Sequence, residues 1–227
     1  MKQKNVKSSF IKSVSAATLL VVFTVLLVGG YWIFKTEAPR PLVTDSHGNE
    51  LFTKDTIKGG QAVFQKYALM DYGTVLGNGS YMGPDYTAEA LKIYTEGMQD
   101  FYAQKSAKVD FADLSKAQKS VIRDQVIDEM RKNRYNKKTD TLVMTDAQVN
   151  GLKEVEKYYH KIFTKGDGWG LQPNLIKEKD MPAKNRAWVS QGDQIKQISD
   201  FFFWTAWLSS TDRPNDDISY TNNWPYY

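Results

Sequence analysis

An uninterrupted apolar segment near the N-terminus restricts the fold of this chain more than any other feature. From Val14 to Phe34, 21 residues pass without a charged side chain. A helix of that length spans about 30 Å at about 1.5 Å per residue, which matches the hydrocarbon thickness of a bilayer. The segment therefore predicts one transmembrane helix, over residues 14–35.

The charges beside this helix predict its orientation. Residues 1–13 contain no acidic residue and four lysines, Lys2, Lys4, Lys7 and Lys12. Basic flanks favour the cytoplasmic side, and aromatic residues such as Tyr31 and Trp32 are typical of the opposite interface. We therefore expect residues 1–13 to be a cytoplasmic tail and residues 36–227 to lie outside the cytoplasmic membrane of a bacterium.

A cleaved signal peptide is the alternative interpretation of the same segment. Signal peptides also place a basic region before an apolar one, but their apolar region usually has about 7 to 15 residues and ends in an A-x-A-like site. This segment is longer, and no such site follows it. The sequence therefore favours a retained anchor.

The remaining composition is that of a neutral globular domain. Without the four N-terminal lysines, 26 of the 30 basic residues remain, against 26 acidic residues. Nucleic-acid binding requires a basic face on the folded domain, so we expect no nucleic-acid partner. The chain has no cysteine, which rules out disulfides and cysteine lipidation and leaves packing to stabilise the domain.

The rest of the chain predicts a mainly α-helical domain with a small β-hairpin. The motif SHGN between PLVT and ELFT indicates a hairpin turn. Apolar residues at helical spacing follow, two helix starts carry capping boxes with a glutamine, and a third start has a serine–aspartate capping pair. The expected helices are Thr56 to Ala68, Thr87 to Gln104, one after Ser115 (paired with Gln118), one after Thr145 (paired with Gln148) and one after Ser190 (paired with Asp193).

Two further segments, one apolar and one rich in glycine and proline, lie near the C-terminus. The stretch Phe201 to Trp207 is apolar but short, and charged residues flank it, so we predict a buried aromatic helix rather than a second membrane span. The residues after Gly166 form a loop of more than 20 residues with glycines and prolines. A loop of that length in a compact domain is usually functional or held against its surroundings.

The residues alone indicate no active site. The two histidines, His47 and His160, lie 113 positions apart without the companions of a metal motif. The acidic pairs Glu154 with Glu156 and Asp216 with Asp217 lie in polar stretches and predict a solvated surface rather than an acid-base pair. The loop GNGSY lacks the pattern and the strand context of a phosphate-binding loop.

The order of motifs resembles a class I cytochrome c. A helix leads into a tight turn, the motif G-x-G-x-Y at residues 77–81 follows, and MP precedes an aromatic C-terminal helix. In particular, the chain is similar to the anchored haem c subunit of nitric oxide reductases. That resemblance places Leu69 and Tyr72 at the two haem-attachment cysteines and Gly73 at the axial histidine, so we expect no haem in this chain. We expect side chains such as Met70 and Tyr72 to fill the porphyrin space, and Met181 to coordinate nothing.

The quinol-dependent nitric oxide reductases are the family that the whole chain resembles. In this family, the anchor and a haem-free cytochrome c-like domain are fused to the catalytic membrane subunit. The resemblance rests on GQAVFQKYALMDYGTVLGNGSYMGPDYTAEAL, GWGLQPN, FFFWTAWLSSTDRP and YTNNWPYY. It implies a structural module that docks on a catalytic core, belonging to the same polypeptide or to a separate chain, and that is not catalytic alone.

The cofactors that the resemblance implies belong to that core rather than to this chain. They are haem b, haem b3, a non-haem iron and a calcium ion, which serve the reduction of two NO to nitrous oxide. The chain ends before any such core, so we expect it to be a fragment or a separately encoded part. By the same resemblance, the carbonyl of Gly79 and the side chain of Tyr81 are candidate calcium ligands, although calcium takes six to eight oxygens.

Two other functions stay open. A membrane-tethered helical sensor domain would also combine one anchor with an outward helical bundle. A haem-binding electron carrier would retain the cytochrome's original role. Covalent haem absorbance separates the carrier from the other two, and the identity of the binding partner separates docking from sensing.

Overall fold

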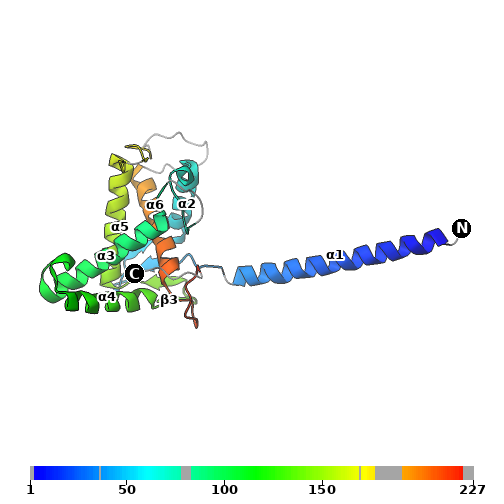
Figure 1. The fold of residues 1–227 in the computed structure, drawn as a ribbon, viewed down its shortest axis with the longest axis horizontal. Helices are drawn as coiled ribbons and strands as arrows, with labels where there is room; N and C mark the ends of the chain where they lie inside the picture. The colour runs from blue at the N-terminus through cyan, green and yellow to red at the C-terminus, as the bar shows by residue number, and fades with distance from the viewer. Residues whose placement is uncertain (1–2, 36, 78–82, 169, 177–190, 222–227) are drawn as a thin grey trace. The chain divides into compact units, whose positions relative to one another are not determined.

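The computed structural model describes residues 3–35, 37–77, 83–168, 170–176 and 191–221 (Figure 1). The chain divides into two units, Met1–Pro39 and Arg40–Tyr227. The first is one helix, and the second is mainly helical with a small sheet. This confirms the predicted fold class.

The first unit contains α1, Gln3–Lys35. Among the described residues, its segment Ser9–Lys35 is the single helix long and apolar enough to cross a membrane. The hydroxyl groups of Thr18 and Thr24 donate to the carbonyls one turn earlier, at 3.0 and 2.8 Å. Such bonds leave no hydroxyl unsatisfied in an apolar environment. The helix begins before the predicted apolar boundary, so the lysines at positions 4, 7 and 12 belong to the same helix.

The predicted hairpin is present, but it belongs to a larger sheet. Strands β1 (Leu42–Thr44) and β2 (Glu50–Phe52) pair antiparallel. Strand β4 (Thr141–Val143) pairs parallel with β1, and β3 (Tyr135–Asn136) pairs antiparallel with β4, giving the order β2-β1-β4-β3. The pairing of β1 with β4 joins segments about a hundred residues apart and has no local sequence signal.

Five helices form the body of the second unit. They are α2 (Lys54–Lys66), α3 (Tyr86–Ala107), α4 (Lys116–Arg131), α5 (Asp146–Lys165) and α6 (Gln191–Ser210), with short 3₁₀ turns η1 (Leu69–Asp71) and η2 (Phe111–Asp113). The capping boxes predicted at Ser115 and Thr145 are confirmed. A further box at Thr53 starts α2. The predicted cap at Ser190 lies outside the described residues.

Helix α6 forms the centre of the domain. Figure 1 shows α6 between α2 and α5, with α3 crossing them, and α6 contacts all three helices. Residues 198–211 are all buried. The aromatic stretch Phe201 to Trp207 is therefore a core element rather than a second span, as predicted.

Glycine allows two pairs of helices to cross closely. A β-carbon on Gly60 of α2 would lie 2.0 Å from the carbonyl oxygen of Gln197 on α6. A β-carbon on Gly97 of α3 would lie 2.8 Å from the Cα of Gly151 on α5. Real β-carbons do not approach other atoms so closely, so these crossings require glycine.

The long loop after Gly166 packs on the domain over its described part. The Asp167 carboxylate accepts bonds from the backbone N–H groups of Gly170 and Leu171, at 2.9 and 3.0 Å. Leu171 and Ile176 are buried. This part of the loop is therefore held against the core, which is one of the two roles expected of a loop of this length.

Candidate functional site

The glycine loop between η1 and α3 is closed at its base by backbone hydrogen bonds. The N–H of Thr74 donates to the carbonyl of Pro84, and the N–H of Tyr86 donates to the carbonyl of Thr74, both at 2.9 Å. The two predicted calcium ligands, Gly79 and Tyr81, lie outside the described residues. The structure therefore fixes the base of this loop.

A hydroxyl pair ties the same base to the central helix. The N–H of Leu76 donates to Oγ1 of Thr87 at 2.9 Å, and that hydroxyl donates to Oγ1 of Thr205 on α6 at 2.9 Å. Thr87 and Thr205 are both buried. Buried hydroxyl groups need such partners, so this pair positions the loop relative to α6.

The three residues that the resemblance places at the haem-attachment positions lie together on one turn. The N–H groups of Tyr72 and Gly73 both donate to the carbonyl of Leu69, at 3.1 and 3.0 Å. Leu69 is fully buried, and Tyr72 is half-buried. These hydrogen bonds hold the three residues beside one another.

Gly73 lies where no side chain fits. A β-carbon built on Gly73 would be 2.6 Å from the carbonyl oxygen of Pro84 and 2.7 Å from Cε2 of Tyr86. The neighbouring segment is equally close, since a β-carbon on Gly83 would lie 1.5 Å from the carbonyl oxygen of Tyr72. The turn at 72–73 and the segment at 83–84 therefore touch through glycine, and position 73 has no room for an imidazole.

A cluster of aromatic rings fills the interior behind this turn. The ring of Tyr86 stacks on Phe202 with centroids 4.6 Å apart and planes at 8°. Phe64 and Tyr159 meet the Tyr86 ring edge-on, at 6.1 and 6.4 Å. The Tyr159 hydroxyl donates to the carbonyl of Tyr86 at 2.9 Å. These rings come from α2, α3, α5 and α6, so the cluster joins four helices.

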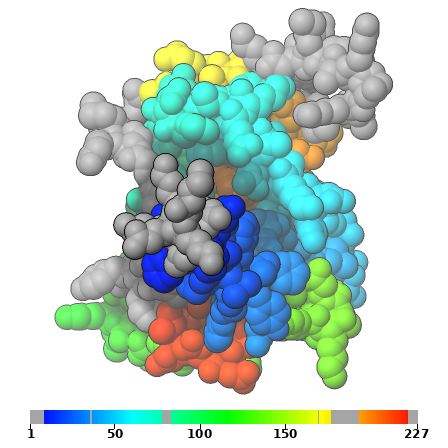
Figure 2. Space-filling view, turned by 90° about the vertical axis from the view of Figure 1, so that its right-hand side faces the viewer, coloured from blue at the N-terminus to red at the C-terminus, as the bar shows by residue number. Residues whose placement is uncertain are grey.

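The prediction that Met70 and Tyr72 fill the interior is wrong for Met70 and only partly right for Tyr72. Met70 is 49% exposed, and the segment around η1 lies at the surface in the space-filling view (Figure 2, turquoise). Met70 therefore does not fill the interior, and Tyr72 does so only in part. Tyr86 and Phe202 were not predicted as filling residues, because core aromatics at helical spacing look alike before their partners are known.

One carboxyl group enters the edge of the aromatic cluster. Oε1 of Glu89 accepts a hydrogen bond from the hydroxyl of Tyr158. Burial raises the pKa of Glu89 above its ordinary value, and this bond partly offsets the effect. Burial likewise raises the pKa values of Tyr86, Tyr158 and Tyr159. The three phenols therefore stay protonated at neutral pH.

The remaining candidate residues lie apart from this region. His47 and His160 are exposed on different elements, and the described residues contain no group of three potential metal-binding side chains. Asp216 and Asp217 are exposed, as predicted.

Glu154 and Glu156, the other acidic pair, each form an ion pair with a lysine. Glu154 contacts Lys157 at 3.1 Å, and Glu156 contacts Lys196 at 3.2 Å. Because the two carboxylates bind different lysines, they do not face each other as an acid-base couple would.

Comparison with known families decides the assignment. The family model of the NorB cytochrome c-like domain of nitric oxide reductase matches residues 40–226. The chain belongs to this family. The match covers the second unit almost completely and does not include α1. A search of curated proteins finds no significant match.

The residues of this nitric oxide reductase domain do not fit a covalently attached haem. Thioether attachment requires cysteines, and the chain contains none. The resemblance places the axial histidine at Gly73, and this position has no room for a side chain. Met181 lies outside the described residues. No electron-transfer step through such a haem follows from these residues.

Proposed function

We propose that this chain is the membrane-anchored N-terminal part of a quinol-dependent nitric oxide reductase, and that its cytochrome c-like domain is a haem-free docking module. The observation that carries the proposal is the contact of Gly73 with Tyr86 and Pro84. A domain that transfers electrons through haem c needs ligands and space at this turn. This chain has neither a haem-ligating side chain nor room for one at this turn.

Packing explains how the fold persists without the prosthetic group. Removing a large buried group leaves a cavity, and large-to-small changes in a core cost about 3 to 5 kcal/mol for an aromatic side chain. In this chain the stacked rings of Tyr86 and Phe202 lie behind the attachment turn. Aromatic packing thus takes over the stabilising role that a porphyrin has in a cytochrome c.

The anchor supports a position beside a membrane protein. All described side chains of Ser9–Lys35 are exposed in the structure, with a mean hydropathy of 2.2 in the most apolar window. A surface of that kind is stable in lipid rather than in water. We infer that the N-terminal lysines stay in the cytoplasm and that the second unit lies outside it.

The proposed partner is the catalytic membrane core of the reductase, in the same polypeptide or in a separate chain. Haem b, haem b3 and the non-haem iron would belong to that core, which would receive electrons directly from quinol and reduce NO to nitrous oxide. A donor dissolved in the membrane makes an outer haem c relay unnecessary. The Gly79 carbonyl and the Tyr81 side chain would complete a calcium site only together with that core.

Affinity purification of the full chain from its own membranes tests this proposal. We expect a polytopic reductase core as the main partner, and no haem covalently bound to this chain in denaturing gels stained for haem. A signalling kinase or chemotaxis protein as the main partner would favour the sensor function instead. A haem-stained band at the size of this chain would favour an electron carrier.

A further inference from the structure

The outward face of α5 carries a line of lysines. Lys153, Lys157 and Lys161 follow one another at intervals of four residues, so they lie on one side of the helix. All three are exposed, whereas the opposite side of α5 is buried through residues such as Val155 and Tyr159. We call Lys153, Lys157 and Lys161 the lysine stripe.

The acidic residues of the same segment lie at the flanks of the stripe. Glu154 lies towards α3, where a β-carbon on Gly97 would be 3.4 Å from its Cγ. Glu156 lies towards α6 and contacts Lys196 at 3.2 Å. Among the ion pairs of the described residues, the stripe takes part in one, between Lys157 and Glu154 at 3.1 Å. Because the Lys157 side chain is 76% exposed, this pair is weak and the stripe keeps a positive charge.

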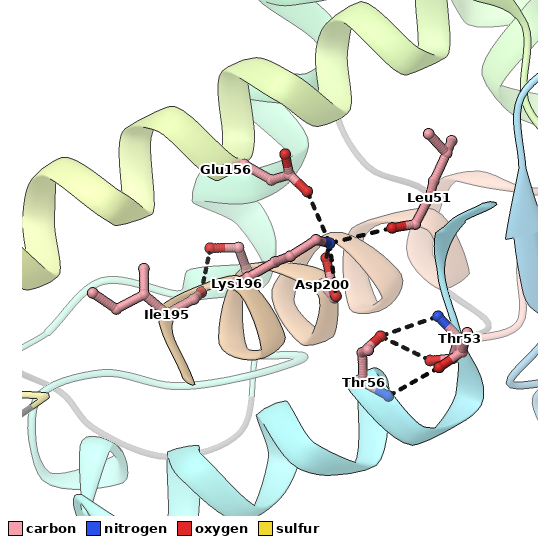
Figure 3. A network of polar contacts seen from close by, with 8 residues as sticks. Leu51, Thr53, Thr56, Glu156, Ile195, Lys196 and Asp200 are labelled. Atoms are coloured by element: carbon pink, nitrogen blue, oxygen red, sulfur yellow. Dashed lines mark hydrogen bonds and ion pairs between the residues drawn. The ribbon is translucent and has the colours of Figure 1, made fainter. Parts of the chain in front are cut away.

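Lys196 of α6 differs from the stripe because acceptors of its own domain surround it. It belongs to a polar network at Asp200, which lies beside β2 and the start of α2 (Figure 3). Its Nζ lies 2.9 Å from Oδ1 of the fully buried Asp200 and 3.2 Å from Oε1 of Glu156. A third acceptor, the carbonyl oxygen of Leu51, lies at 3.2 Å. An ammonium group has three protons, so Lys196 has none left for a partner.

A groove of about 330 Å³ lies between α5 and α6, next to the stripe. Lys153, Lys157 and His160 line it from α5, and Ile195 and Ser199 line it from α6. The Ser199 hydroxyl donates its proton to the carbonyl of Ile195 at 2.8 Å. The donors that the groove offers to a ligand therefore come from α5, and they suit a carboxylate group.

The stripe is unfavourable for the helix that carries it. Like charges four residues apart repel one another and destabilise a helix. The chain beyond residue 13 has as many acidic as basic residues, so a local excess of positive charge does not follow from its composition. Both observations favour a role for the stripe outside the fold of this domain.

We propose that the lysine stripe and the adjacent groove are the surface with which this domain docks on an acidic segment of its partner. The inference rests on the proposed docking function and names the face that docks. Neighbouring lysines of the stripe are about 6 Å apart along the helix axis. Alternate side chains of an extended chain are roughly 6.6 Å apart. The partner segment is therefore an extended one, with acidic residues at alternate positions.

Carbodiimide cross-linking of the full chain in its membrane assembly tests this surface. The reagent joins a lysine amine directly to a carboxylate in contact with it, whether the core is fused to this chain or separate. We expect cross-links from the lysine stripe to acidic residues of the reductase core. Links within the pairs Lys157–Glu154 and Lys196–Glu156, at 3.1 and 3.2 Å, show that the reaction works. These internal links without any link from the stripe to the core would overturn the proposal.

Three lysines elsewhere on the domain provide a matched comparison. Lys116 at the start of α4, and Lys137 and Lys138 between β3 and β4, are also exposed. We expect them to give no links to the core. Links from these lysines at the same yield as from the stripe would contradict a specific docking face.

Substitutions in the stripe separate docking from a structural role. The triple variant Lys153→Gln, Lys157→Gln, Lys161→Gln loses the repulsion within α5, so its thermal midpoint should equal or exceed that of the wild type. Co-purified with the core expressed as a separate polypeptide, it should bind about tenfold more weakly at low salt. The corresponding triple arginine variant keeps the charge and should bind as the wild type does. Equal binding by the glutamine and arginine variants would overturn the proposal.

Two further outcomes identify what fails. The absence of a reductase core from the wild-type assembly would overturn the proposed function and this inference with it, whereas a core that leaves the stripe unlinked overturns this inference alone. Acylation of the stripe lysines, measured on the full chain in vesicles without the core, tests a lipid occupant. Protection in phosphatidylglycerol vesicles but not in phosphatidylcholine vesicles would assign the stripe to the bilayer surface and contradict the proposal.

Discussion

Gly73 and Tyr86 touch so closely that a β-carbon on Gly73 would lie 2.7 Å from Cε2 of the tyrosine ring. The Tyr86 ring is held in its position because it stacks on Phe202. This contact connects the turn at residues 69–73 to the aromatic core. It explains why this domain, although it belongs to a cytochrome c-like family, has no room for a haem-ligating side chain at position 73.

Substituting this glycine should destabilise the domain. Gly73→Ala forces a methyl group against Pro84 and Tyr86, and overpacking of this kind costs about 1 to 3 kcal/mol. Gly170→Ala is a matched control, since its added methyl would meet the Tyr72 ring at an ordinary 3.6 Å. The midpoint of thermal unfolding measures the stability of both variants. Equal midpoints for the two variants would show that the contact at Gly73 is not tight.

Restoring the attachment residues should not restore a cytochrome. The triple variant Leu69→Cys, Tyr72→Cys, Gly73→His supplies the missing ligands but introduces an imidazole where no β-carbon fits. Expressed together with a c-type haem maturation system, it should remain free of covalent haem or fail to fold. A well-folded variant with a Soret band and a haem-stained band would show that the interior can open.

The crossing of α2 and α6 gives a prediction that is independent of haem. A β-carbon on Gly60 would lie 2.0 Å from the backbone oxygen of Gln197, whereas one on Gly59 would meet only the flexible end of the Gln197 side chain, at 2.6 Å. Backbone cannot move aside as a side chain can. We expect Gly60→Ala to lower stability by about 2 kcal/mol or more, and Gly59→Ala by much less. Chemical denaturation gives the free energy of unfolding of each variant. A larger loss of stability in Gly59→Ala than in Gly60→Ala would contradict the close crossing of α2 and α6.

Glu89 gives the fold a pH dependence of known sign. Burial holds the pKa of Glu89 in the folded state above its ordinary value, so the folded chain binds the proton more tightly than the unfolded chain does. Stability from this group is present below the unfolded value and is lost as pH rises through the folded one. Glu89→Gln keeps an acceptor for Tyr158 and should flatten the slope of unfolding free energy in this range. An unchanged slope would contradict the raised pKa.

Local signals in the sequence predicted much of the fold. Ser115 and Thr145 each have a glutamine three residues later, so one short motif determined each helix start, and the apolar run of α1 needed no partner to be recognised. The box at Thr53 was missed because its third residue is Thr56 rather than a glutamate or glutamine. The parallel pairing of β1 with β4 was missed because neither strand exceeds three residues and their contact is distant in sequence.

The sequence indicated which turn to examine, but it did not predict which side chains pack against that turn. The resemblance placed the vacated attachment positions at Leu69, Tyr72 and Gly73, which stays a prediction, and the structure shows that these residues share one turn. It could not show that Tyr86 occupies the space beside Gly73, because that contact depends on the path of residues 83–86. The network at Asp200 was also missed, because a single aspartate four residues after a lysine is typical of any solvated helix until α2 and β2 are placed against it.

The measurement that tests the haem-free docking function most directly is the electron-donor dependence of NO reduction by the purified reductase assembly that contains this chain. We expect a quinol to support turnover, reduced cytochrome c not to do so, and the reduced spectrum to contain only b-type haem. Turnover with cytochrome c, together with a c-type haem bound to this chain, would contradict a haem-free docking module.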